Sequence, residues 1–175
     1  MYNLRCINRI KHLLDNKTLV LIINALIFSR LFYCFTFIVF GYTSSTNISK
    51  LQLIQNFACK IILGIKKFAH ISAARQSLGW RGVRQKLLLN TVTMVYKCRT
   101  TQVPPYLCDL FHDRFSVSGR NTRDMSQLNL PKCRLSTGKR SFAFRGAKEY
   151  NLLPENIRNI NDISSFIKGK WPTLF

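Results

Sequence analysis

Acidic residues are scarce in this chain of 175 residues, which has seven Asp and Glu against 27 Lys and Arg. The acids are scattered, and no two of them are adjacent. Phosphoryl transfer on divalent metal ions needs clustered carboxylates, so this composition argues against a metal-dependent polymerase or nuclease site. The formal net charge is +20. Such self-repulsion is relieved by a polyanion, an anionic membrane or an acidic partner protein.

Several catalytic motifs are also missing. The chain has neither a G-x-x-x-x-G-K-[ST] loop for phosphates nor a G-x-S-x-G turn for a nucleophilic serine. His12, His70 and His112 are far apart in sequence and have no supporting pattern of acids. We interpret them as surface or packing residues. We therefore predict that the chain is not an enzyme and uses no cofactor.

The six cysteines contain no C-x-x-C pair, and several of them lie inside apolar helical patterns. Cys98, Cys108 and His112 form a C-x9-C-x3-H set, but no fourth zinc ligand has a suitable spacing. We predict free thiols in a reducing compartment and no metal site. The expected location is intracellular, in the cytoplasm or nucleus, with a membrane as the alternative.

The longest apolar run, residues 19–42, has the length of a membrane span. Polar residues interrupt it, and Arg30 lies near its centre. A central Arg costs about 2.5–3.5 kcal/mol on membrane insertion. We favour one or two buried core helices, broken near Ser29 or Arg30, against which amphipathic helices pack. A small membrane protein anchored by residues 19–42 is the alternative.

Apolar residues at helical spacing predict that most of the remaining chain is α-helical. Asn47 or Thr46 suits the start of one helix and Gly64 its end, and Asn161 or Asp162 suits the start of the last helix. The predicted helices cover residues 3–14, 47–63, 83–99, 106–111, 141–152, 153–160 and a final stretch that ends at Gly169.

A short edge strand is indicated where Leu128 and Leu130 alternate with Asn129 before Pro131. The predicted fold class is therefore mainly α. We expect a basic, helical bundle-like N-terminal portion at residues 1–103 and a smaller α+β C-terminal portion at residues 104–175.

The densest basic stretch runs from residue 60 to residue 99 and contains nine Lys and Arg without an acid. It covers two predicted helices and the link between them, which suits contact with a phosphate backbone. Aromatic residues beside Arg, at Trp80 and at residues 142–144, suit base stacking, but this spacing is also typical of core packing. We predict that RNA or DNA binds mainly at Lys60, Lys66, Lys67, Arg75, Arg81, Arg84, Lys86, Lys97 and Arg99.

Several short motifs follow one another in a recognisable order and spacing. They are LFYC (31–34), VFG (39–41), LIQNFACKIILG (53–64), VYKC (95–98), PPYL (104–107), LP (130–131), RGAK (145–148), NLLP (151–154) and SFIK (165–168). Together they resemble the region downstream of the polymerase core in LINE-type (non-LTR) retrotransposon reverse transcriptases, over about residues 3–170. The chain departs from that pattern at Phe40, where Trp is usual, at Arg81-Gly82 in place of Leu-Pro, and at Glu149-Tyr150 in place of an aliphatic–Trp pair.

The resemblance implies a thumb-like helical region that helps to hold template and primer, followed by a C-terminal segment. In that family the fingers and palm lie upstream, and their metal-binding Tyr/Phe-Ala-Asp-Asp motif is absent from this chain. The implied function is a nucleic-acid-holding fragment of an RNA-directed DNA polymerase, with the upstream core as its partner. A non-functional translated relic that binds polyanions through charge alone is a further alternative.

Overall fold

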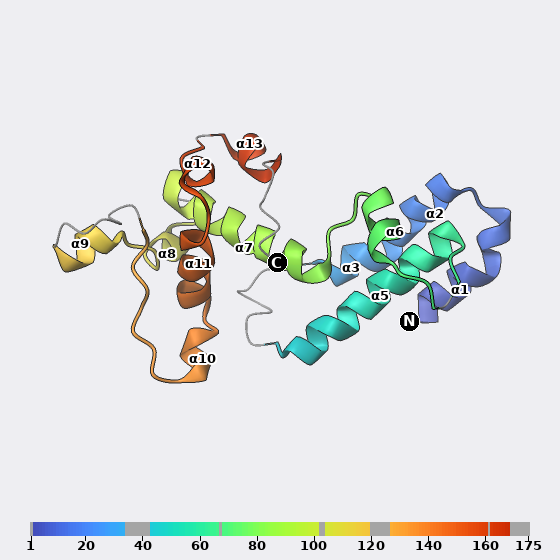
Figure 1. Ribbon diagram of the computed structural model, residues 1–175, viewed down its shortest axis with the longest axis horizontal. Helices are drawn as coiled ribbons and strands as arrows, with labels where there is room; N and C mark the ends of the chain where they lie inside the picture. Colours follow the sequence, from blue (N-terminus) through green and yellow to red (C-terminus); the bar gives the residue numbers. More distant parts are fainter. Residues whose placement is uncertain are drawn as a thin grey trace. The chain divides into compact units, whose positions relative to one another are not determined.

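The computed structural model describes residues 2–33, 43–66, 68–101, 104–119, 127–160 and 162–168. Over these residues the chain is mainly α-helical, which confirms the predicted class (Figure 1). The chain divides into two compact units. Unit 1 is Met1–Phe35 with Thr43–Lys86, and unit 2 is Thr36–Tyr42 with Leu87–Phe175. The domain boundary predicted between residues 103 and 104 stays a prediction.

Unit 1 is a small helical bundle in which the long helix α5 packs against α1, α2 and α6 (Figure 1). Its elements are α1 (Tyr2–Ile10), η1 (Lys11–Leu13), α2 (Asn16–Ile23), η2 (Asn24–Phe28), α3 (Ser29–Leu31), α5 (Ser45–Leu63) and α6 (Ser72–Ser77). The apolar stripes of these helices meet in one core. That core consists of Leu4, Ile7, Leu19, Ile23, Phe28, Ala58, Ile61 and Ile62.

Local capping sets the ends of α5. The Ser44 hydroxyl accepts a hydrogen bond from the Asn47 N–H at 3.3 Å, so the cap lies before the predicted Asn47 or Thr46. Ser44 is extended, as a capping residue must be, whereas Thr46 and Asn47 are already inside the helix. At the other end Gly64 has a φ of 63°, which confirms its predicted role as the stop.

The apolar run 19–42 is described as far as residue 33. Its helix continues through Ser29 and Arg30, where a break was predicted, and reaches Leu31. The irregularity lies earlier, at the π-helical turn η2, since such a turn lets a helix bend without ending. Among the described residues, no helix combines the length and apolarity that a membrane crossing requires. Residues 34–42 of the run lie outside the described residues.

Unit 2 is built along α7, whose first turn belongs to unit 1. Tyr96 on α7 stacks on Phe166 with ring centroids 4.2 Å apart, and its hydroxyl donates to the Ile160 carbonyl at 2.6 Å. Helix α11 lies close to α7 at Gly146. A Cβ added there would lie 3.0 Å from Val95 Cγ2, so a residue without a Cβ fits this contact. The elements are α7 (Val83–Thr100), α8 (Pro105–Cys108), α9 (Arg114–Ser118), α10 (Ser136–Lys139), α11 (Phe142–Asn151), α12 (Glu155–Arg158) and α13 (Ile163–Lys168).

The α+β character predicted for the C-terminal portion is not supported by the described residues. Strand-like pairing there amounts to one isolated antiparallel bridge between Asp113 and Leu128. The physical reason is that backbone pairing is limited to this bridge, where the Arg114 N–H donates to the Gln127 carbonyl and the Asn129 N–H to the His112 carbonyl. On the other side of the segment a side chain, Asn151, hydrogen-bonds both backbone polar groups of Leu128 in place of a further strand.

Candidate nucleic-acid interface

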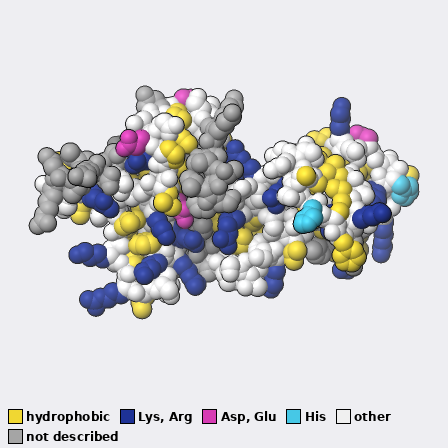
Figure 2. All heavy atoms as spheres, viewed as in Figure 1, with side chains coloured by type: hydrophobic (Ala, Val, Ile, Leu, Met, Phe, Trp, Pro, Cys, Tyr) yellow, Lys and Arg dark blue, Asp and Glu magenta, His cyan; other side chains and the backbone are white. Residues whose placement is uncertain are grey.

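Unit 1 concentrates positive charge, with 13 Lys and Arg and a single acid, Asp15, in its two segments. Asp15 caps α2 by accepting hydrogen bonds from the Lys17 and Thr18 N–H groups at 3.1 and 3.3 Å. Hydrogen bonding from Thr18 is the main cause that holds the pKa of Asp15 below its usual value. One carboxylate cannot neutralise 13 cations, so the unit presents a field that attracts polyanions. Lys and Arg side chains are visible across both units in Figure 2.

Two glutamines of α5 fix the segment that leads into α7. Gln55 is 2% exposed and donates to the Arg81 carbonyl at 2.9 Å. Gln52 accepts from the Val83 N–H at 2.9 Å and donates to Gln55 Oε1 at the same distance. These bonds satisfy backbone groups that regular secondary structure leaves unpaired. They also place the exposed side chains of Arg81 and Arg84 at the start of α7.

The predicted binding residues differ in their exposure. The residues that are exposed are Lys66, Arg81, Arg84, Lys97 and Arg99, although the Arg99 side chain is only 29% exposed, and the partly buried ones are Lys60, Arg75 and Lys86. Lys67 lies outside the described residues. Lys97 and Arg99 belong to unit 2 and the others to unit 1. Within the predicted set, Lys66, Arg81 and Arg84 are therefore the exposed cations that belong to unit 1.

Lys86 is partly buried and packs against an aromatic ring of unit 1. Its Nζ lies 3.7 Å from the centroid of the Phe32 ring, within the range of a cation–π contact. Burial lowers the pKa of Lys86 below its usual value. A phosphate contact would have to compete with this packing, so Lys86 is a weaker candidate than its exposed neighbour Arg84. Its predicted role in binding stays a prediction.

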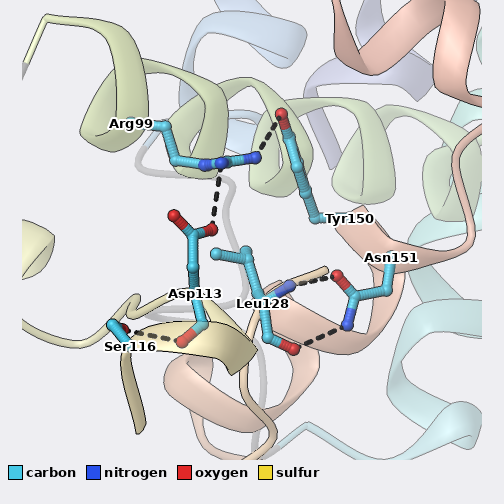
Figure 3. A network of polar contacts seen from close by, with 6 residues as sticks. All are labelled: Arg99, Asp113, Ser116, Leu128, Tyr150 and Asn151. Atoms are coloured by element: carbon cyan, nitrogen blue, oxygen red, sulfur yellow. Dashed lines mark hydrogen bonds and ion pairs between the residues drawn. The ribbon is translucent and has the colours of Figure 1, made fainter. Parts of the chain in front are cut away.

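Arg99 joins three elements of unit 2, as Figure 3 shows. Its Nη2 lies 3.0 Å from Asp113 Oδ1, and its Nη1 donates to the Tyr150 hydroxyl at 3.4 Å. Asp113 in turn is steadied by the Ser116 hydroxyl, which donates to its carbonyl at 2.7 Å. Because this guanidinium already has a carboxylate partner, it contributes less to polyanion attraction than an unpaired cation. Its predicted contact with nucleic acid stays a prediction.

A cavity of about 490 Å³ lies beside Arg99 in unit 2 and contains the three residues of the C-x9-C-x3-H set. Among the described residues, no three His, Cys, Asp or Glu side chains are placed to hold a metal ion. Burial, with a smaller contribution from Cys108, raises the pKa of Cys98 to about 11. Both cysteines are free thiols. Cys98 is thus protonated at neutral pH, and a protonated thiol is a poor nucleophile. The lining residues are Cys98, Arg99, Pro105, Cys108, Asp109, Phe111, His112 and Asp113.

Two of the aromatic residues considered for base stacking are used for packing. Trp80 makes an edge contact with Phe28 at 4.7 Å and packs against the core of unit 1. Phe142 is buried and makes an edge contact with Phe111 at 5.3 Å. The sequence interpretation missed Phe68, whose side chain is 92% exposed in the loop between α5 and α6. Its position between Lys67 and His70, just after a helix stop, was the available signal.

Comparisons with known proteins identify no relative of this chain. No family model, curated protein or solved structure matches it.

Proposed function

We propose that this chain is a nucleic-acid-holding module of a LINE-type retrotransposon reverse transcriptase, which grips template and primer by the sugar–phosphate backbone. The chain supplies grip and no chemistry, because the carboxylates of a polymerase site are absent from its sequence. An upstream polymerase core is its partner in this proposal. Such a role belongs inside the cell, in the cytoplasm or nucleus, where RNA and DNA are present.

The observation that carries the proposal is the exposure of Lys66, Arg81 and Arg84 in a unit with one acid. Arg81 and Arg84 lie on a segment held to α5 by partly buried hydrogen bonds, so their backbone positions are fixed before binding. Pre-positioned cations lose less conformational entropy when they meet phosphates. The resemblance of the ordered motifs, which include most of α5, supports the more specific assignment to a retrotransposon protein.

The proposal is tested by removing the three exposed cations together, as Lys66→Gln, Arg81→Gln and Arg84→Gln. We expect weaker binding to both duplex DNA and single-stranded RNA. The slope of log K against log salt on duplex DNA should flatten by up to about 2.7 units, or roughly 0.9 for each phosphate that the variant no longer neutralises. Fluorescence anisotropy of a labelled oligonucleotide, titrated at several salt concentrations, measures both quantities.

A matched control removes the same charge from unit 2, as Lys132→Gln, Arg134→Gln and Lys139→Gln. These three side chains are also exposed, and none is in the predicted set. The control should keep most of the affinity and a salt slope close to that of the unaltered chain. Equal losses in the two triple variants would mean that bulk charge alone binds nucleic acid, as expected of a translated relic.

A further inference from the structure

A groove of about 360 Å³ opens on the surface of unit 1, between α1, α5 and the stretch from η2 to α3. Helix α1 packs against α5 (Figure 1) and against η2, which brings these elements together. The residues that line the groove are mainly aliphatic. Leu4 is buried, Ile27, Leu31 and Ile54 are partly buried, and Leu26 is 50% exposed. The groove therefore has apolar walls, one side of which packs on the core of unit 1.

The π-helical turn η2 forms one wall of this groove. Leu26 and Ile27 belong to the turn, and Arg30 and Leu31 follow four residues later on α3. Helical residues four apart lie on the same face, so the two pairs adjoin each other along the wall. Single π turns inside α-helices are uncommon and occur frequently at functional sites. The irregular turn is thus a second feature that distinguishes this surface from an ordinary helix face.

Arg30 places a cation beside the apolar walls, and this residue is exposed. Unit 1 contains a single acid, Asp15, whose carboxylate caps α2 by accepting from the Lys17 and Thr18 N–H groups. Unit 1 has no second acid to pair with Arg30, so a carboxylate for its guanidinium has to come from elsewhere. A ligand that complements this surface combines apolar side chains with a carboxylate close to them.

We propose that the groove binds an amphipathic α-helix of a partner protein, whose apolar side chains enter the groove and whose Asp or Glu pairs with Arg30. Helices that bind in grooves present apolar anchors at positions i, i+3 or i+4 and i+7. An acid one turn from an anchor lies on the same face, as Arg30 does relative to Leu26. The inference goes beyond the proposed function, because none of the groove residues belongs to the predicted nucleic-acid contacts.

The shape and chemistry of the groove favour a helix over a membrane or a polynucleotide. Membrane-surface helices insert protruding apolar side chains between lipids, whereas a concave site is filled by side chains of its partner. Polynucleotides bind through phosphates and through bases that stack on aromatic rings. Aliphatic walls offer little to either group, whereas they match the Leu and Ile side chains of an amphipathic helix.

The test uses the full chain and a fluorescein-labelled helical peptide with Leu at positions i, i+4 and i+7 and Glu one turn from the central Leu. The comparison probes are a scrambled peptide of the same composition and a peptide with Lys in place of that Glu. Fluorescence anisotropy in about 150 mM salt, which screens long-range attraction, measures the affinities. We expect the designed peptide to bind roughly tenfold or more tightly than the scrambled one, the effect of burying one Leu side chain.

Two variants address the two halves of the proposal. Leu26→Asp should weaken binding of the designed peptide roughly tenfold, because it puts a charge on the apolar wall. Since Leu26 is half-exposed, this variant should fold, which circular dichroism checks, and the uncharged Leu26→Gln repeats the test. Arg30→Gln should weaken binding by about 1.4- to 5-fold, the usual effect of one exposed ion pair, and should reduce the preference for Glu over Lys in the peptide.

The matched controls are Leu21→Asp and Lys17→Gln on α2, because both residues are exposed and neither lines the groove. They should leave peptide affinity unchanged. Equal affinity for the designed and scrambled peptides would overturn the proposal, and so would equal losses in Leu26→Asp and Leu21→Asp. The proposal would also be wrong if Leu26→Asp weakened sedimentation with phosphatidylserine–phosphatidylcholine vesicles but not peptide binding. Affinity for duplex DNA should be unchanged in Leu26→Gln, which keeps this outcome separate from that of the proposed function.

Discussion

The side-chain amide of Asn151 pairs with both backbone polar groups of Leu128. Asn151 Oδ1 accepts from the Leu128 N–H at 2.8 Å, and Nδ2 donates to the Leu128 carbonyl at 2.9 Å (Figure 3). A neighbouring strand would make the same two bonds. Leu128 is fully buried, so both groups would otherwise be desolvated without a partner. Asn151 thus holds one side of the extended segment, and backbone hydrogen bonds to Arg114 and His112 hold the other.

Replacing Asn151 with Ala should destabilise unit 2. The substitution leaves a buried N–H and a buried carbonyl unpaired, which costs about 1–3 kcal/mol for each such group. Asn151→Asp should also destabilise unit 2, because the carboxylate still accepts from the Leu128 N–H but no longer donates to the Leu128 carbonyl. Urea unfolding followed by circular dichroism measures the change in the free energy of unfolding. Asn156→Ala, at an exposed position on α12, is the control and should have little effect.

The same pair of residues shows why helices were easier to predict than the C-terminal segment. Gly64 ends α5. Asp162 precedes α13, and its carboxylate accepts from the Ser165 N–H at 2.7 Å. Both signals act within one helical turn. The partner of Leu128 lies 23 residues away in sequence. An alternating Leu-Asn-Leu pattern indicates extended backbone, but it does not reveal whether a strand or a side chain satisfies that backbone.

The basic stretch was visible in the sequence, but its division into exposed and packed cations was not. Lys86 and Arg99 are long, flexible cations like Arg84. Lys86 nevertheless contacts the Phe32 ring, and Arg99 forms an ion pair with Asp113. Those partners lie 54 and 14 residues away, so helical periodicity does not identify them. Phe68 was missed for a related reason, since a Phe is expected in a core until its neighbours in space are known.

Gln55 links the stability of unit 1 to its candidate interface. Its replacement with Ala should cost about 0.5–1.5 kcal/mol, the net contribution of a hydrogen bond, because the Arg81 carbonyl would lose its donor. The segment before α7 should loosen, and affinity for nucleic acid should fall although no charge is removed. Gln76→Ala, at an exposed position on α6, serves as the control. Unchanged stability and affinity in Gln55→Ala would show that this hydrogen bond does not position Arg81.

Glu149 should make stability depend on pH. Burial raises the pKa of this carboxyl above its ordinary value of 4.5, against the opposing effect of Arg145 and Lys148. Its Oε2 is buried without a hydrogen-bond partner. A raised pKa means that the folded state holds the proton more tightly than the unfolded state. Stability is therefore lost as pH rises from about 4.5 through the folded-state pKa.

The corresponding variant is Glu149→Gln, which cannot ionise. It should be more stable than the unaltered chain at pH 7, and the gain should vanish near pH 3.5, where both states carry a protonated Glu149. Thermal unfolding across that range measures the difference. Glu155→Gln is the control, because Glu155 is exposed on α12 and should give no such gain. If the difference in stability between Glu149→Gln and the unaltered chain did not change with pH, the burial of the Glu149 carboxyl would be contradicted.

The salt dependence of binding is the most direct test of whether this chain holds nucleic acid. We expect the unaltered chain to bind duplex DNA with a log–log salt slope near −5, corresponding to roughly six engaged phosphates, and with a shallower slope on single strands. Oligonucleotides of scrambled sequence should bind with similar affinity, because backbone contacts carry no sequence information. Fluorescence anisotropy at salt concentrations from about 50 to 200 mM gives this slope. Binding that does not respond to salt, or no binding at all, would contradict a role in holding nucleic acid.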